Sequence, residues 1–153
     1  MISALSKLTQ EEIDLMKRTP ALVTILVAGA DKKIEQSELR EAVALAKLKQ
    51  SRSREILKEY YGEVSVEFEG VLNDLIGSMP SDPEKRAKVV VEELEKLNAI
   101  LPKLEKPFAS QFYASMKDFS RKVAEASGGV FGYLSVSYEE AKLMDLKMIK
   151  DPS

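Results

Sequence analysis

The sequence predicts an all-α fold in a single domain, and three observations support this. The chain has 153 residues, the size of one ordinary domain with one core. It contains only seven glycines and six prolines, and helix-forming residues dominate it. Its apolar residues recur every three or four positions, and the strict alternation typical of strands is rare. We therefore expect one bundle of about seven helices over residues 1–153, with short connections and no interdomain linker.

The first helix is expected to begin at Thr9, because Thr9 and Glu12 form a T-x-x-E capping box. Pro20 should interrupt it, since the proline ring disfavours helical geometry at the preceding residue. A second piece then runs from Pro20 to about Gly29. Three more helices are expected before residue 80: 36–49, a short one around 56–61 that ends at Gly62, and 65–77 with Ser65 as its cap.

The second half of the chain begins with a strong helix start. Asp82 offers a capping side chain and Pro83 suits the first turn, so we expect a helix from there to Leu101, ended or kinked by Pro102. The next helix begins near Pro107 and carries the clearest amphipathic pattern in the chain. A last helix is expected over 138–150. The apolar positions of the amphipathic helix are Phe108, Phe112, Met116, Phe119, Val123 and Ala126.

Composition excludes several classes of function. The chain has no histidine and no cysteine, which removes His-based and thiol-based catalysis, zinc ribbons and disulfides, so we predict that it is not an enzyme. With a net charge of −2, the chain lacks the excess of basic residues typical of a nucleic-acid-binding protein. The longest apolar stretch, 21–30, is half of a membrane span, and the N-terminal residues carry no secretory-signal pattern. We therefore expect a cytoplasmic protein with no transmembrane segment.

One helix–turn–helix pattern occurs twice. The first copy, residues 28–38, follows A-x-A-D-x-x-I-x-x-x-E, and the second, residues 124–140, follows A-x-A-S-G-G…V-S-x-x-E with a longer loop. Alignment of Ile34 with Val136 places Glu38 opposite Glu140. Each copy therefore predicts a helix end, a turn and an acidic helix start.

These two motifs resemble those of the TerB-like family of helical proteins, which is named from bacterial tellurite-resistance operons. The resemblance extends over most of the chain. The resemblance implies a compact helical domain of two related halves and a cytoplasmic, non-enzymatic accessory role in metal or envelope stress. It also implies a divalent-cation site at the acidic turns. The residues in the matching positions are Asp31, Glu35, Glu38, Glu139 and Glu140.

The acidic turns leave two interpretations open. Clustered carboxylates are suitable ligands for Ca²⁺ or Mg²⁺, which prefer oxygen, and a bound cation would relieve their mutual repulsion. The same acids at helix starts also stabilise the helix dipole without any ligand, by about 0.3–1 kcal/mol each. Spacing from Asp31 rules out an EF-hand, because Gln36 stands where that loop needs glycine.

A run of basic residues surrounds the expected end of the 36–49 helix: Lys47, Lys49, Arg52, Arg54 and Lys58. Such a run suits an anionic partner, and it is equally expected from the negative end of the helix dipole. No aromatic residues are interleaved with it, which argues against nucleic acid. As an alternative to the cation-linked accessory role, we consider a ligand-free scaffold that binds a protein partner or associates with itself.

Overall fold

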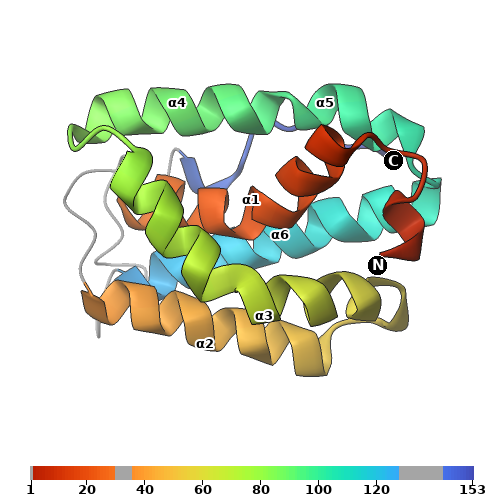
Figure 1. Ribbon diagram of the computed structural model, residues 1–153, viewed down its shortest axis with the longest axis horizontal. Helices are drawn as coiled ribbons and strands as arrows, with labels where there is room; N and C mark the ends of the chain where they lie inside the picture. Colours follow the sequence, from red (N-terminus) through yellow and green to blue (C-terminus); the bar gives the residue numbers. More distant parts are fainter. Residues whose placement is uncertain (1, 30–35, 128–142) are drawn as a thin grey trace.

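The computed structural model describes residues 2–29, 36–127 and 143–153, and these form helices joined by turns and loops, with no strand among them (Figure 1). The all-α prediction is confirmed. In these residues there are five long helices rather than about seven, and two of the expected breaks are absent. They are α1 (Gln10–Ala28), α2 (Gln36–Arg52), α3 (Glu55–Ser78), α4 (Pro83–Glu95) and α6 (Lys106–Ser127). Shorter pieces are η1 (Ser3–Leu5), α5 (Leu97–Ile100) and η2 (Leu101–Lys103).

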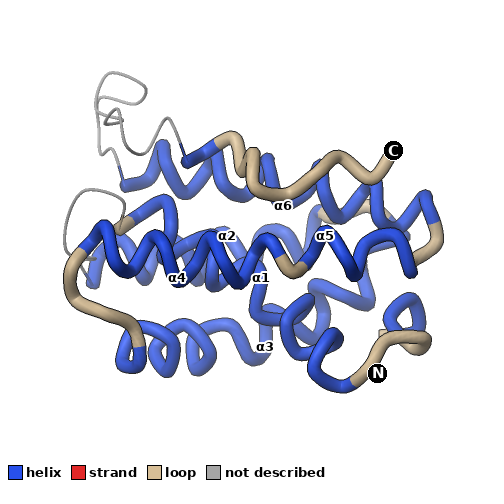
Figure 2. Tube along the Cα trace, turned by 90° about the horizontal axis from the view of Figure 1, so that it is seen from above, coloured by secondary structure: helices blue, strands red, loops and turns tan. Residues whose placement is uncertain are grey.

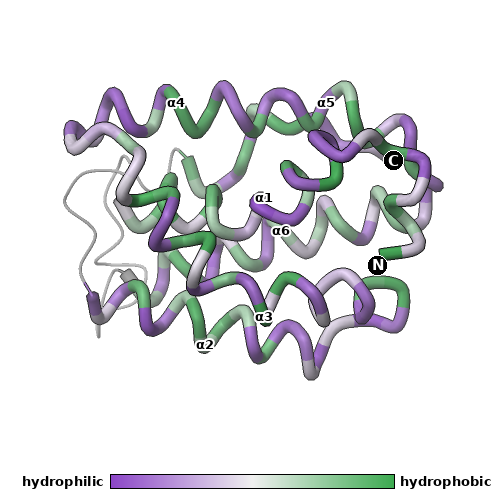
Figure 3. Tube along the Cα trace, viewed as in Figure 1, coloured by the Kyte–Doolittle hydropathy of each residue, from purple (hydrophilic) through white to green (hydrophobic). Residues whose placement is uncertain are grey.

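Helix α1 is the central element of the bundle. It packs against α3, α4 and α6, while α2 packs against α3 and α6. The two views place α3 and α6 on either side of α1, and α4 with α5 along the edge opposite α2 (Figures 1 and 2). Every residue from Thr19 to Gly29 is buried, so the second half of α1 is surrounded on all sides. The outer helices instead alternate between hydrophilic and hydrophobic residues, as amphipathic helices do (Figure 3).

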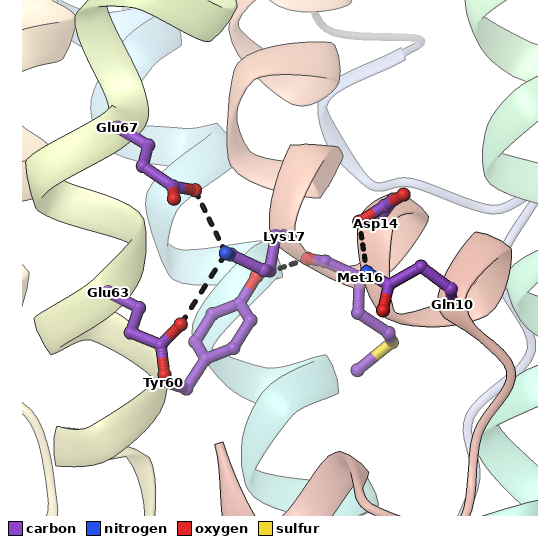
Figure 4. Close-up of polar contacts among 7 residues, drawn as sticks. All are labelled: Gln10, Asp14, Met16, Lys17, Tyr60, Glu63 and Glu67. Atoms are coloured by element: carbon purple, nitrogen blue, oxygen red, sulfur yellow. Dashed lines mark hydrogen bonds and ion pairs between the residues drawn. The ribbon is translucent and has the colours of Figure 1, made fainter. Parts of the chain in front are cut away.

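Helix α1 continues through Pro20, so the predicted interruption there is wrong. Proline has no N–H, and the carbonyl of Met16, four residues earlier, therefore loses its partner within the helix. The buried hydroxyl of Tyr60 on α3 donates a hydrogen bond of 2.6 Å to this carbonyl (Figure 4). A contact between distant parts of the chain thus compensates for the local defect.

Helix α3 also continues where two shorter helices were predicted. Gly62 lies inside it instead of ending a helix, and a Cβ at this position would meet no atom within 4 Å. Ser65 is not a cap, since its hydroxyl donates to the side-chain oxygen of Gln50 on α2 at 2.8 Å. Leu57, Tyr60, Tyr61, Val64, Phe68 and Leu72 form one buried face along the helix. This continuous apolar face outweighs the weak helix propensity of a single glycine, about 1 kcal/mol.

The strongest predicted helix starts are confirmed. Thr9 accepts a hydrogen bond from the Glu12 amide at 3.2 Å, and the Glu12 side chain accepts one from the Thr9 amide at 2.9 Å. Asp82 caps α4 by accepting from the Lys85 amide at 3.0 Å. The helix that Asp82 caps ends at Glu95, earlier than the predicted Leu101, and Pro102 lies in η2 beyond α5.

The expected last helix over 138–150 ends earlier than predicted. Leu143 and Met144 are helical, but the chain leaves the helix at Asp145. Leu146 then adopts a left-handed φ of 51°, which turns its fully buried side chain into the core. Residues 128–142, which include positions 138–142 of the expected helix, lie outside the described part of the chain.

Polar side chains hold this last segment on the bundle. Ser120 on α6 donates to the Met144 carbonyl at 2.7 Å. The Asn98 amide group donates to the Met148 carbonyl at 2.9 Å and accepts from the Lys150 amide at 2.8 Å. None of the described helices has an apolar stretch long enough to cross a membrane.

Candidate functional site

A groove of about 570 Å³ lies between α2 and α6, and residues at the start of α3 line one end of it. The C-terminal half of α2 forms one wall and the middle of α6 forms the other. We call it the α2–α6 groove. Its lining residues are Leu45, Leu48, Lys49, Arg52, Ser53, Arg54, Leu57, Gln111, Ala114, Ser115, Asp118, Phe119 and Lys122.

The groove combines apolar and cationic side chains. Leu57 and Phe119 are buried beneath it, whereas Leu48 is 44% exposed in its wall. Four of its lining side chains are cationic, namely Lys49, Arg52, Arg54 and Lys122, and one is a carboxylate. The groove therefore carries an excess of positive charge on a chain whose net charge is −2.

Asp118 links the two walls. Its carboxylate lies 2.5 Å from Lys49 Nζ on α2 and 3.1 Å from Lys122 Nζ on α6. Partial burial raises the pKa of Asp118, but the hydrogen bonds from Lys49 and Lys122 outweigh this effect, and the pKa is lowered overall. The carboxylate therefore stays ionised at neutral pH and holds both lysine side chains beside the groove.

A buried hydrogen bond supports the groove from below. Tyr61 on α3 and Ser115 on α6 approach within 2.5 Å through their hydroxyl oxygens. Burial raises the pKa of Tyr61 far above neutrality, although its hydrogen bond with Ser115 acts in the opposite direction. Tyr61 therefore remains a neutral hydroxyl that fixes the spacing of α3 and α6.

The predicted cation site is not tested by the described residues. Asp31, Glu35, Glu139 and Glu140 all lie outside them. Glu38 is in the first turn of α2 and is 8% exposed. Within residues 2–29, 36–127 and 143–153, no group of three or more acidic side chains is arranged to hold a metal ion.

A second polar cluster joins α1 and α3 (Figure 4). Lys17 Nζ lies 3.0 Å from Glu67 and 3.4 Å from Glu63. The hydrogen bond to Glu67 contributes most to raising the pKa of Lys17. The amine therefore remains a charged ammonium and is unsuited to act as a base or nucleophile, and we interpret this cluster as a link between helices.

Three of the four cationic residues of the α2–α6 groove were noted in the sequence, as part of a basic run. Lys49, Arg52 and Arg54 belong to the basic run noted at the end of α2. Asp118 and Lys122 on α6 were missed, although their spacing of four residues on the polar side of an amphipathic helix was a usable signal. The pairing of this face with α2 is a tertiary contact that the sequence pattern does not specify.

Comparison with known proteins adds no family to this description. No family model, no curated protein and no solved structure matches this chain.

Proposed function

We propose that this chain is a non-enzymatic protein-interaction module whose α2–α6 groove binds an acidic amphipathic helix of a partner protein. The observation that carries the proposal is the combination of exposed apolar surface at Leu48 with four cationic side chains around one groove. A helix with leucines on one side and glutamates beside them is complementary to both features.

A helical partner fits better than an extended one. An extended peptide usually binds by adding a strand to an exposed sheet edge, and the described residues contain no strand. A groove between two helices instead accepts the side chains of a third helix, spaced by three and four residues. Leu48 supplies the apolar contact, and Arg52, Arg54 and Lys122 supply the charge.

The chemistry of the groove supports binding rather than catalysis. Asp118 is ionised and bound by two lysines, so it is a poor general acid at neutral pH. The Tyr61 hydroxyl is buried and its pKa is raised. Among the described residues that line the groove there is no nucleophile–base pair, since the lysines engage a carboxylate, Ser115 engages a tyrosine and the Ser53 hydroxyl has no hydrogen-bond partner.

Fluorescence anisotropy with a designed 15-residue peptide tests the proposal. The peptide carries leucines at helical spacing and glutamates beside them, and a scrambled peptide of the same composition is the control. We expect saturable binding of the first peptide, weakened roughly tenfold or more by Leu48→Glu and by Lys122→Glu. Affinity should also fall as salt is raised from 50 to 300 mM.

A charge reversal outside the groove controls for net charge. Lys88 is exposed on α4, which does not line the groove, so Lys88→Glu should leave the affinity nearly unchanged. Equal binding of the scrambled peptide, or equal loss in Lys88→Glu and Lys122→Glu, would overturn the proposal. Concentration-dependent sedimentation that Leu48→Glu abolishes would identify a second copy of the chain as the occupant in place of a partner.

The cation-linked accessory role is a second candidate, which the two sequence motifs support. Here the cytoplasmic chain would bind Ca²⁺ or Mg²⁺ weakly through Asp31, Glu35, Glu38, Glu139 and Glu140. Glu38 favours this candidate, because a carboxylate at 8% exposure stands directly after one of the acidic turns. Calorimetric titration and thermal shift with Ca²⁺, Mg²⁺ and Mn²⁺ test it. If several millimolar of each cation gives no heat of binding and no change in melting temperature, this second candidate is overturned.

A further inference from the structure

We propose that one end of the α2–α6 groove is a subsite for a phosphate monoester carried by the bound partner segment. The subsite consists of Arg52, Ser53 and Arg54, at the junction of α2 and α3, and we call it the arginine corner. This inference rests on the proposed function and names the chemistry that the groove recognises. Three independent features of the corner favour a dianionic oxygen group.

The first feature is the pairing of the cations. Lys49 and Lys122 share the Asp118 carboxylate, which neutralises part of their charge. Arg52 and Arg54 are exposed, and neither has a carboxylate within ion-pair distance among the described residues. The positive charge of the groove is therefore least compensated at this corner. Guanidinium groups bind two oxygens of one phosphate at once, which lysine cannot do.

The second feature is the Ser53 hydroxyl. Its oxygen is buried and has no hydrogen-bond partner in the described structure, while Ser53 itself lines the groove. A buried hydroxyl without a partner is energetically unfavourable. Rotation of the Ser53 side chain about its Cα–Cβ bond would bring the hydroxyl to the groove, where it can donate to a bound oxygen.

The third feature is the start of α3. Arg54 is the N-cap residue of this 24-residue helix, and it provides no side-chain hydrogen bond to the first turn. The first backbone N–H groups of a helix attract anions, and here they adjoin two arginines and a serine. The acids nearby are Glu55, which is exposed and forms no ion pair among the described residues, and Asp118, which is held by two lysines. A phosphate with two charges competes better for this corner than a carboxylate with one.

Phosphorylated versions of the designed peptide test the inference. Phosphoserine is placed at the first or at the last position, because the direction of the bound helix decides which end meets the corner. We expect one of the two phosphopeptides to bind at least fivefold more tightly than the unphosphorylated peptide. Arg52→Gln and Arg54→Gln should reduce this gain to less than twofold, and Arg54→Lys should retain only part of it. Lys47→Gln, on the same helix but outside the groove, should keep the gain.

The arms of the experiment separate the two proposals. Binding of the unphosphorylated peptide with no gain from either phosphoserine would overturn the subsite and leave the proposed function standing. Failure of all peptides would overturn the proposed function. Titration of inorganic phosphate, followed by the amide signals of residues 52–57, then decides whether the corner binds free phosphate. If 20 mM inorganic phosphate shifts none of these amide signals and neither phosphopeptide binds more tightly, the arginine corner binds neither free nor peptide-borne phosphate, and the inference is overturned.

Discussion

The hydroxyl of Tyr60 donates a hydrogen bond to the Met16 carbonyl, which Pro20 leaves without a partner inside α1. The Met16 carbonyl is buried, so without Tyr60 it would be left without a partner inside the core. The aromatic ring of Tyr60 also packs edge-on against Tyr61 and Phe112, with ring centroids 5.1 and 5.5 Å away. One residue thus joins the backbone of α1 to the aromatic core between α3 and α6.

Tyr60→Phe should lower the free energy of unfolding by about 1–3 kcal/mol, because it keeps the ring but leaves the Met16 carbonyl unsatisfied. In a Pro20→Ala background the cost should be smaller, since the new amide at position 20 can bond to that carbonyl. Urea unfolding of the four chains measures the coupling. An equal cost in both backgrounds would show that Tyr60 does not compensate for the proline.

Asp118→Asn should reduce stability in a way that depends on pH. The folded pKa of Asp118 is lowered, so its stabilising effect is present above the unfolded value of about 3.9 and is lost as the pH falls through the folded value. At neutral pH we expect the loss to be about 1 kcal/mol or less, since this side chain is 41% exposed. The difference between wild type and variant should shrink below pH 4. A difference that stays constant between pH 3 and 7 would contradict this assignment.

Helix α3 shows how a long element tolerates weak positions. Gly62 and Gly70 lie within it, and a Cβ at either position would meet no atom within 4 Å. The apolar face of the helix therefore compensates for the backbone entropy that each glycine costs.

Gly62→Ala and Gly70→Ala should each raise the free energy of unfolding by about 0.5–1 kcal/mol, because alanine restricts the unfolded chain and finds open space in the folded one. Chemical denaturation of the single and double variants checks this. The effects should add, since the two sites lie two helical turns apart. A loss of stability in either variant would contradict a continuous α3.

Asn98 helps to hold the last segment of the chain, because its side chain bonds to two backbone groups there. Asn98→Ala should lower stability by about 1–2 kcal/mol, because the Met148 carbonyl and the Lys150 amide both lose their partner. Hydrogen exchange at the Lys150 amide should accelerate in this variant. Asn73→Ala, on the exposed side of α3, is the matched control and should leave that amide unchanged.

Local signals in the sequence predicted the helices where the deciding interactions are local. The capping box of Thr9 and the cap at Asp82 each depend on residues within three positions, and both are confirmed. Pro20 and Gly62 were interpreted as breaks because their local propensities are poor. The contacts that overrule them come from Tyr60, 44 residues from Met16, and from the buried face of α3. The α2–α6 groove likewise has one part that local sequence predicts and one that it does not. Its α2 side is a local basic run, whereas its α6 side depends on tertiary packing.

At the scale of the whole molecule, charge is distributed unevenly. The chain is slightly acidic overall, yet its α2–α6 groove has four cationic side chains and one carboxylate. If the proposed function holds, this face attracts acidic partners, and the rate of their association should fall with ionic strength. In that case the exposed apolar surface at Leu48 adds a hydrophobic contact to the electrostatic attraction.

The most direct test of the central claim is a map of amide chemical shifts in the isotope-labelled chain as the acidic amphipathic peptide is added. We predict that the largest shifts occur in residues 45–57 and 111–122, on the two walls of the groove, and saturate with the affinity seen by anisotropy. Shifts concentrated on α4, or none anywhere at millimolar peptide, would contradict the account.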